Sequence, residues 1–311
     1  MEEDRKFAPV VIPTLCRYEH FRRCIESLAR CKYADKTELI IGLDYPLKES
    51  HVEGYRKIKE YLESGIEGYG KLTVIMHTKN QGGVQNYQHI LKKAFNRYDR
   101  VIVSEDDNEF APDFLDYVNK GLDRYEDSPE VVAICGYNYP INMEDYPDTS
   151  YLSHNYSAWG CGLWRSKNER YLNTMTLDRC KRLLRNPGAV IKILRIKPTL
   201  LISLWHMIRK NTLLGDVNRE IYNIVDNHYC LFPRLSMVRN WGHDGSGINC
   251  GDANNDLYLR QDIDCSQEFD MSGEVRILPP TYNKRLRKFF GDRPYDLVLR
   301  TCRYIRKHLC K

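Results

Sequence analysis

The 311-residue sequence lacks the features that mark several large classes of protein. No run approaches 18 uncharged apolar residues and the mean hydropathy is −0.57, which together exclude a polytopic membrane protein. The first residues show no charged segment followed by an apolar one, so we expect a chain that is not secreted. Neither G-x-G-x-x-G nor G-x-x-x-x-G-K-[ST] occurs, which argues against NAD-dependent enzymes and P-loop nucleotide hydrolases.

The eleven cysteines also lack a functional pattern. Their number is odd, their spacing is irregular, and no C-x-x-C pair occurs, so neither a disulfide framework nor a zinc site is indicated. We therefore expect reduced structural thiols in a cytosolic protein.

Charge is unevenly distributed along the chain. Residues 179–210 contain nine Lys and Arg and no acid, and residues 284–311 contain ten against Asp292 and Asp296. Because the formal net charge is only +5, the remainder of the chain carries −12. The sequence therefore combines an acidic body with two basic segments.

The first 136 residues alternate strand-like and helix-like patterns. Apolar, mostly β-branched runs predict five strands, at Ala8–Ile12, Glu38–Leu43, Leu72–His77, Arg100–Ser104 and Val131–Cys135. Apolar residues at helical spacing predict helices within residues 19–31, 52–65, 84–95 and 112–125. Continuous apolar strands joined by amphipathic helices are typical of an α/β fold, with a mostly parallel sheet covered on both faces. In such sheets ligands bind beyond the carboxyl ends of the strands.

The alternation fades beyond residue 140. Lys167–Lys210 is helical and basic, and Asp216–Asn227 predicts a further helix. Phe232–Asn240 predicts an extended segment that leads into the glycine-rich Gly242–Gly247. No repeat or flexible linker separates the two halves, so we expect the second half to pack against the first.

Three consecutive acids follow the fourth predicted strand: Glu105, Asp106 and Asp107. Unpaired neighbouring carboxylates repel one another, and Mg²⁺ or Mn²⁺, which prefers hard oxygen ligands, would relieve that repulsion. The alternative is a solvated acidic turn at the start of the next helix, where negative charge is favourable. Arg17 and Asp44 follow the first two strands and are candidates to hold a phosphate and a ribose or base, although each taken singly is better explained as a surface charge.

One segment resembles a known family. The run VIVSEDDNEFAPDFLDYV closely resembles the metal-site segment of GT-A-fold glycosyltransferases, both the N-acetylglucosaminyltransferase I-like group (family 13) and bacterial family 2 enzymes. VVIPTLCR resembles their nucleotide-binding first loop, IIGLD their second strand with its Asp, and NQGGVQNYQHILKKAF the segment leading to the donor site. WGCGLW and RLSMVRNWGHDGSGIN resemble later segments of the bacterial members.

The resemblance covers most of the chain and implies a GT-A fold, a mostly parallel twisted sheet with helices on both faces plus a mixed C-terminal region on the acceptor side. It implies a nucleotide-sugar-binding half at residues 1–136 and an acceptor-binding and catalytic half of the same domain at residues 137–283. Residues 284–311 then form a basic amphipathic C-terminal segment.

The resemblance also implies roles for individual residues. The donor-binding residues are expected to be Pro13, Thr14, Arg17, Asp44, Asn80, Gly82, Glu105 and Asp106. Asp107 is similar to the direct metal ligand, for Mn²⁺ or Mg²⁺, and His243 is a second candidate ligand or a simple loop histidine beside Asp244.

Catalytic and acceptor-binding residues come from the second half. Asp216 aligns with the Trp-Asp pair that supplies the catalytic base in many relatives, although Gly215 stands where tryptophan is usual; Asp244 is the second candidate. Trp159 and Trp164 are candidate stacking faces for an acceptor sugar. Core packing accounts equally well for one of the two tryptophans.

The implied reaction is a metal-dependent, inverting transfer of a hexosyl or N-acetylhexosaminyl group. The donor is expected to be a UDP-linked sugar, and the acceptor a glycan hydroxyl whose proton a carboxylate accepts, a contribution of about 10²–10⁴-fold. One rival is a sugar-nucleotidyltransferase, which would normally show a glycine-rich first loop. The other is a non-catalytic relative that binds a sugar or nucleotide.

The basic segments predict contact with a membrane. Thr199–Lys210 and residues 284–311 combine apolar and aromatic residues with Lys and Arg, as do segments that lie in anionic interfaces. Each basic residue near such a surface contributes about 1 kcal/mol. We expect a cytoplasmic chain, peripheral on the inner face of the cytoplasmic membrane, acting on a lipid-linked glycan in cell-surface polysaccharide synthesis. Nucleic acid is not expected as a partner, because the acidic body opposes a polyanion; a solvated helical face is the remaining alternative.

Overall fold

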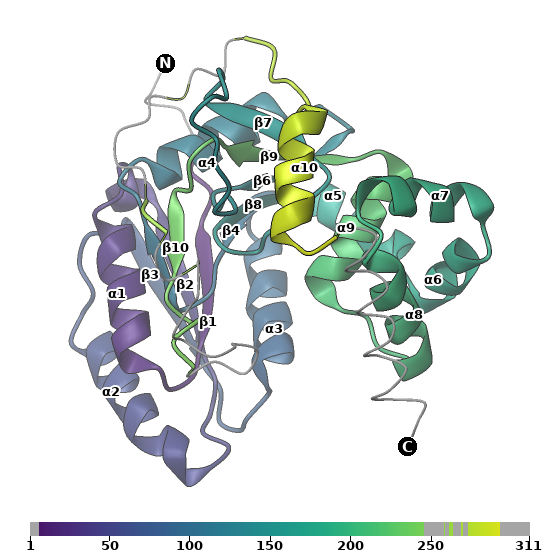
Figure 1. The fold of residues 1–311 in the computed structure, drawn as a ribbon. Coiled ribbons are helices and arrows are strands. Elements are labelled where there is room, and N and C mark those ends of the chain that lie inside the picture. The colour runs from purple at the N-terminus through teal and green to yellow at the C-terminus, as the bar shows by residue number, and fades with distance from the viewer. Residues whose placement is uncertain (1–5, 246–257, 259–260, 264–268, 270–272, 293–311) are drawn as a thin grey trace.

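The computed structural model describes residues 6–245, 258, 261–263, 269 and 273–292. Within them the chain forms a mixed eight-stranded sheet in the order β3-β2-β1-β4-β8-β6-β9-β7 (Figure 1). The strands are β1 Val10–Thr14, β2 Glu38–Leu43, β3 Lys71–Met76, β4 Arg100–Val103, β6 Val131–Cys135, β7 Ser150–Ser153, β8 Cys161–Trp164 and β9 Tyr229–Pro233. A separate antiparallel ribbon pairs β5 Asn108–Phe110 with β10 Val238–Asn240.

The first four strands of the sheet are parallel, as the sequence predicts. β1 pairs in parallel with both β2 and β4, and β2 pairs with β3. Side chains alternate between the faces, so that Val10 and Ile12 enter one core and Val11 enters the other. Burial on both faces explains why these strands read as continuous apolar runs.

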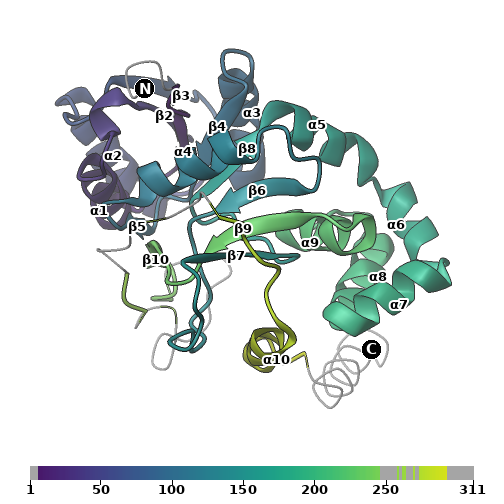
Figure 2. The same cartoon turned by 90° about the horizontal axis from the view of Figure 1, so that it is seen from above.

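Helices cover both faces of the sheet (Figures 1 and 2). α1 Tyr18–Ala29, α2 Val52–Glu63 and α4 Phe114–Arg124 contribute to one core. α3 Gly83–Phe95 lies on the other face, where the core continues into a group of helices. That group consists of α5 Arg165–Thr174, α6 Leu177–Leu184, α7 Pro187–Ile196, α8 Leu200–Lys210 and α9 Gly215–Asp226. The predicted α/β class is confirmed.

Strand β8 is the main departure from the expected pattern. The WGCGLW segment, whose glycines suggest a tight bend, forms a strand that runs antiparallel to both β4 and β6. Gly160 does make a turn, with φ at +69°. Gly162 lies inside the strand, and a Cβ there would stand 2.7 Å from Cγ1 of Val118. Its missing side chain therefore lets α4 pack directly on the sheet.

Local sequence signals set the boundaries of the basic helices. Thr176 caps α6 by accepting a hydrogen bond from the Arg179 amide at 3.2 Å, and Asn186 caps α7 through the Ala189 amide at 3.1 Å. Pro187 then occupies the first turn of α7, where its missing N–H is not needed.

The two segments expected to contact a membrane lie differently. In α8 the apolar Leu200, Leu204 and Met207 are buried in the core, so these side chains are not available to a lipid surface. α10, Pro280–Phe289, covers the start of the C-terminal segment, and residues 293–311 lie outside the described residues. No helix in the described part of the chain is long and apolar enough to cross a bilayer.

Candidate active site

The acidic loop lies at the carboxyl edge of the parallel strands. Asp106 and Asp107 are buried, whereas the side chain of Glu105 is exposed. Thr14, the last residue of β1, donates a hydrogen bond from Oγ1 to Oδ2 of Asp106 at 2.8 Å. Because β1 and β4 are neighbouring parallel strands, their carboxyl ends meet here. The structure thus brings together residues predicted from the first and fourth loops.

Arg17 lies between the two buried carboxylates. Its Nη2 pairs with Oδ1 of Asp106 and lies 2.8 Å from Oδ2 of Asp107. Burial disfavours the guanidinium charge, but the two carboxylates outweigh this effect and raise the pKa of Arg17. The expectation of unpaired carboxylates is therefore wrong for Asp106 and Asp107. The donor-binding role of Arg17 stays a prediction.

The β5–β10 ribbon fixes the other side of Asp107. Asn240 donates from Nδ2 to Oδ1 of Asp107 at 2.7 Å, and the Trp241 amide donates to the Asp107 carbonyl at 2.8 Å. A Cβ on Gly242 would stand only 2.1 Å from Oδ2 of Asp107, so only glycine fits beside this carboxylate. Asn240 is a site residue that sequence reasoning missed, because its partner lies 133 positions away.

The oxygen ligands at the carboxyl edge of the sheet suit a hard divalent cation. Glu105 and Asp107 offer carboxylate oxygens, which suit Mn²⁺ or Mg²⁺ with the rest of the coordination shell left to phosphate and water. Among the described residues, no three His, Cys, Asp or Glu side chains form a metal cluster. The ring of His243 packs instead against Tyr258, with centroids 4.3 Å apart, and against Trp159 at 5.6 Å.

Glu105 faces a second acid from the far half of the chain. Burial raises the pKa of Glu105 to about 8, and the charges of Asp107 and Asp216 add to this shift. Asp216 lies in the first turn of α9; burial, with the neighbouring Glu220, raises its pKa to about 6 against the opposing effect of Arg219. Both residues are exposed at the surface, so the surrounding protein, rather than close burial of the carboxylates, raises these pKa values.

Aromatic residues surround the start of α9. Arg219, one turn after Asp216, is buried and stacks on Tyr171 at 4.1 Å and on Tyr156 at 4.9 Å. It also donates to Oδ1 of Asn168 at 2.6 Å. Sequence reasoning missed this arginine, although its spacing of three from Asp216 places both on one helix face.

Asp44 organises the loop before α3. It accepts hydrogen bonds from the amides of Tyr45 and Gln81 on Oδ1, and from the Gly82 amide and Asn80 Nδ2 on Oδ2. Gly82 has φ of +80°, which glycine adopts without strain. The structure therefore brings together three residues of the predicted donor pocket, and their binding role stays a prediction. Pro13, in β1, is half-buried and pairs in register with Gly42 of β2, two residues before Asp44.

The two predicted acceptor tryptophans have different environments. Trp164 is buried, donates from Nε1 to the Leu122 carbonyl at 3.2 Å, and carries the Lys167 ammonium 3.6 Å above its ring. Its ring is therefore closed to a sugar, and core packing accounts for it. Trp159 is half-buried and packs edge-on against Tyr137 at 4.6 Å.

Asp244, the second candidate base, already has a partner. Nε2 of His20, on α1, lies 3.1 Å from its Oδ2. The pair joins α1 to the loop after β10, on the side of the acidic triplet.

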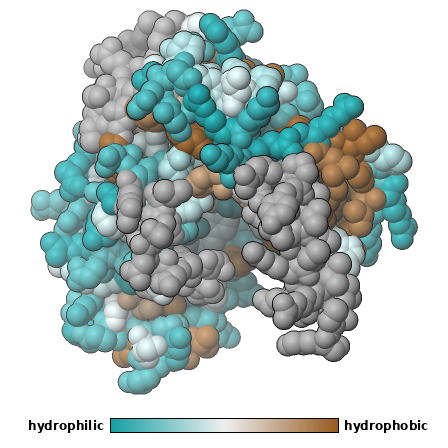
Figure 3. All heavy atoms as spheres, in the orientation of Figure 1, coloured by the Kyte–Doolittle hydropathy of each residue, from teal (hydrophilic) through white to brown (hydrophobic). Residues whose placement is uncertain are grey.

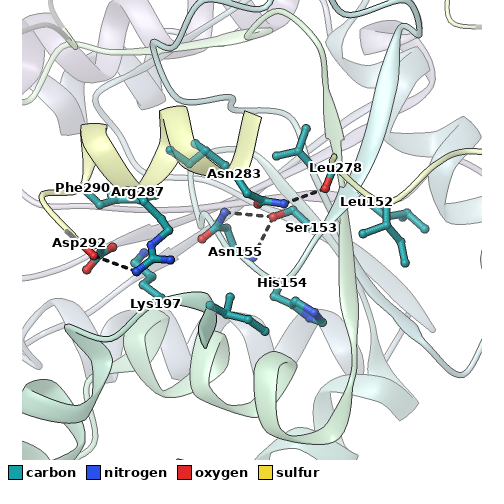
Figure 4. Close-up of a pocket in the computed structure, with 13 residues that line it drawn as sticks. Leu152, Ser153, His154, Asn155, Lys197, Leu278, Asn283, Arg287, Phe290 and Asp292 are labelled. Atoms are coloured by element: carbon teal, nitrogen blue, oxygen red, sulfur yellow. Dashed lines mark hydrogen bonds between the residues drawn. The ribbon is translucent and has the colours of Figure 1, made fainter. Parts of the chain in front are cut away.

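A small pocket lies elsewhere, between α10, β7 and the end of α7 (Figure 4). Its cavity of about 40 Å³ has room for one or two waters and contains none of the predicted site residues. Thr199 bonds to the buried Asp292 at its margin, and Asn283 donates to the Leu278 carbonyl at 2.7 Å. The first contact ties Asp292, just after α10, to the start of α8, and the Leu278 amide donates to the Leu152 carbonyl of β7 at 2.9 Å.

Solved structures resemble the chain at low identity. The Pyrobaculum calidifontis mannosyltransferase PcManGT, solved with GDP-Man and Mn²⁺, is 18% identical over 54% of this chain and 47% of that one, with a TM-score of 0.37. Residues 1–349 of Staphylococcus aureus TarS, solved with UDP-GlcNAc, are 14% identical over 54% and 48%, with a TM-score of 0.40. Mouse xyloside xylosyltransferase 1 is 12% identical over 72% and 83%, with a TM-score of 0.35. The chain thus spans about half the length of the first two.

No curated protein matches the chain. A family model does: the model of glycosyl transferase family 2 matches residues 10–185, which include β1–β4 and the acidic loop. The expected likeness to family 13 stays a prediction. Because the match covers more than half of the sequence, the chain belongs to glycosyl transferase family 2 and has the GT-A class of fold.

Proposed function

We propose that the chain transfers a sugar from a UDP-linked donor to a hydroxyl group of a glycan acceptor, with inversion at the anomeric carbon. Family membership supports glycosyl transfer as the reaction class, and we propose that the group transferred is a hexosyl or N-acetylhexosaminyl group. The observation that carries the proposal is the group of Thr14, Arg17, Asp106 and Asp107 at the carboxyl ends of β1 and β4, beside which the charge of Asp216 acts on Glu105. A single displacement at the anomeric carbon requires a base on the acceptor side and donor-binding groups on the opposite side.

Asp216 is the proposed general base. A sugar hydroxyl is a weak nucleophile at neutral pH, so its proton must be accepted as the new bond forms. With a pKa of about 6, Asp216 is mostly ionised at pH 7, and no described residue hydrogen-bonds or ion-pairs with its carboxylate. Asp244 is the weaker candidate because His20 already contacts it.

The donor occupies the carboxyl edge in this proposal. Arg17 and Thr14 lie where the diphosphate would be bound, and the loop held by Asp44 lies where the base and ribose would be bound. Glu105 and Asp107 would hold Mn²⁺ or Mg²⁺, which when bound supplies positive charge as the leaving diphosphate gains negative charge. Asp106, held by Thr14, fixes the position of Arg17.

The acceptor is proposed to be a lipid-linked glycan at an anionic membrane, as in cell-surface polysaccharide synthesis. α7 and all of α6 after Asp178 lie in residues 179–210, the region with nine basic residues and no acid. On α7, Ile191 is 47% exposed and Leu194 41%. Figure 3 shows an apolar patch over α6 and α7, with hydrophilic side chains around it. Exposed aliphatic residues among basic ones suit the inner face of the cytoplasmic membrane.

A donor-hydrolysis screen tests the reaction. The chain is incubated with Mn²⁺ and a panel of nucleotide sugars, and release of nucleoside diphosphate is measured for wild type, Asp216→Asn and Asp226→Asn. Asp226, at the other end of α9, pairs with Arg179 and serves as the matched control. Release by wild type and the control supports a transferase.

Two other outcomes would contradict the proposal. Pyrophosphate release from a nucleoside triphosphate and a sugar phosphate would identify a sugar-nucleotidyltransferase. Donor binding by calorimetry without any release, with or without glycan acceptors, would identify a non-catalytic sugar-binding relative.

Flotation with liposomes tests the membrane proposal separately. The double variant Ile191→Ser/Leu194→Ser should lose much of the binding of the wild type to vesicles rich in anionic lipid. Leu172→Ser, at a 58% exposed position on α5, is the control. Equal flotation of all three proteins, or binding that RNA competes away, would contradict contact between α7 and lipid.

A further inference from the structure

We propose that Arg17 is an internal counter-cation which must leave Asp106 and Asp107 before a divalent cation binds there, so that cation and nucleoside diphosphate bind cooperatively. The inference rests on the proposed function and adds to it a coupling between the two ligands. It concerns Arg17 as a positioning residue, beyond its expected contact with the donor.

Every oxygen of the two buried carboxylates already has a contact. On Asp106, Oδ1 pairs with Arg17 and Oδ2 accepts from Thr14 at 2.8 Å. On Asp107, Oδ1 accepts from Asn240 at 2.7 Å and Oδ2 lies 2.8 Å from Arg17 Nη2. Each oxygen has a second lone pair, so a cation can share an oxygen of Asp107 with a neutral donor such as Asn240, but not with a positively charged guanidinium.

Arg17 is the contact that can be replaced. Asn240 is buried and belongs to a strand, and Gly242 has no side chain beside Oδ2 of Asp107, where a Cβ would stand only 2.1 Å away. The Arg17 side chain is 25% exposed and projects from the loop just before α1. Two positive charges on one carboxylate oxygen repel each other, so a divalent cation and the guanidinium cannot share Oδ2.

The displaced guanidinium needs a new anion, and a diphosphate supplies one. Arginine binds phosphate oxygens with two parallel hydrogen bonds, which offsets the loss of its contacts with the carboxylates. A nucleoside diphosphate that draws Arg17 away thus frees Asp107 for the cation. By linkage, the cation must then tighten diphosphate binding by the same factor.

Binding of Mn²⁺ alone gives the sharpest test, because it needs no turnover. Free Mn²⁺ is titrated by electron paramagnetic resonance against wild type, Arg17→Gln and Arg23→Gln, without nucleotide. Arg23 is on the same helix but lies over the Trp241 ring, 4.2 Å from its centroid, and controls for general loss of charge. We expect Arg17→Gln to bind Mn²⁺ at least tenfold more tightly than wild type, and Arg23→Gln to stay within twofold.

A double variant separates displacement from net charge and guards against misfolding. Arg17→Gln/Asp106→Asn removes one charge of each sign, so the local net charge is that of the wild type and no extra buried carboxylate is left without a partner. It too should bind Mn²⁺ at least tenfold more tightly. In the wild type, UDP should tighten Mn²⁺ binding at least tenfold, and this coupling should be smaller in both Arg17 variants.

The opposing outcomes are distinct. If folded Arg17→Gln and the double variant both gain less than tenfold, or if Arg23→Gln gains as much, the inference is overturned while the proposed transfer stands. If no variant binds Mn²⁺ with or without UDP, the inference and the proposed metal use fail together. Donor hydrolysis without metal would then show whether the transfer reaction survives.

Discussion

Two pairs of acids meet at the carboxyl edge, and their surroundings are opposite. The inner pair, Asp106 and Asp107, is buried, and a neighbouring arginine, threonine or asparagine contacts each of its oxygens. The outer pair, Glu105 and Asp216, has no side-chain hydrogen bond or ion pair to any described residue. The pKa of each is raised, as burial also raises the pKa of Asp106, so the contacts and not the direction of the pKa shift separate the two pairs. Glu105 and Asp106 are therefore neighbours in the sequence whose charges have different consequences for the protein.

The difference separates stability from reactivity. Carboxylates whose oxygens are held by an arginine and by hydrogen bonds stabilise the fold, and those contacts keep the oxygens from a substrate. Carboxylates without such bonds weaken the fold when ionised, and they retain the capacity to accept a proton or bind a ligand. We therefore expect substitutions in the inner pair to lower stability, and substitutions in the outer pair to lower activity while leaving the fold intact.

Asp216→Asn should have the largest effect. Removing the proposed base is expected to lower kcat for sugar transfer by about 10²–10⁴-fold, the usual contribution of general-base catalysis. The melting temperature should stay the same or rise, because a like charge near Glu105 is lost. A fall in kcat of less than tenfold, measured with saturating donor and acceptor, would place the base elsewhere.

The pH dependence should follow the same carboxylate. Asp216 accepts a proton only when ionised, so kcat/KM should fall about tenfold per pH unit below its pKa of about 6 and level off above it. In Asp216→Asn the residual rate should lack this step. An unchanged profile in the variant would assign the titration to another group.

Asp106→Asn should cost stability. It removes a charged partner of Arg17 and one acceptor of the Thr14 hydroxyl, a loss of about 1–3 kcal/mol in the free energy of unfolding. Urea denaturation at neutral pH measures this loss in the free energy of unfolding. Asp123→Asn, which removes the partly exposed partner of Arg100, should cost less than 1 kcal/mol. Equal losses would remove the distinction between the inner pair and an ordinary surface ion pair.

Glu105→Gln should have the smallest and opposite effect. The folded-state pKa of about 8 lies above the value of an unfolded glutamate, so ionisation of Glu105 lowers stability as pH rises from about 4.5 to 8. The glutamine variant lacks this loss. Because the side chain is exposed, we expect a gain of only about 0.5 kcal/mol at pH 9 and none at pH 4. A Glu105→Gln protein that is less stable than the wild type at pH 9 would contradict this prediction.

The parallel half of the fold could be predicted because its strands are short and buried on both faces. Glu38–Leu43 and Val131–Cys135 coincide with β2 and β6, and β1 begins two residues later than expected. The acidic loop was also predictable, since residues after parallel strands share one edge. Asp216 was found through family resemblance, and its role as the base stays a prediction.

The remainder depends on contacts that sequence spacing does not encode. Arg17 meets Asp106 from 89 positions away, and Asn240 meets Asp107 from 133. Trp164 looked equivalent to Trp159 because both flank the same glycines, yet the alternation of a strand buries it. β7, in a polar and tyrosine-rich stretch, is a strand only because it pairs with β9. In each case tertiary contacts override the local pattern.

The position of β8 determines whether the two predicted halves can be exchanged between related proteins. β6 belongs by sequence to residues 1–136, but both of its neighbours in the sheet, β8 and β9, come from after residue 136. A chimera joined there must rebuild the ladders from β8 to β4 and from β6 to β8 and β9 with foreign strands. A fragment ending there would expose the bare edges of β4 and β6, which favour aggregation. Recombination of donor and acceptor specificities should therefore proceed through loops and the α5–α9 helices, with all eight strands kept from one parent.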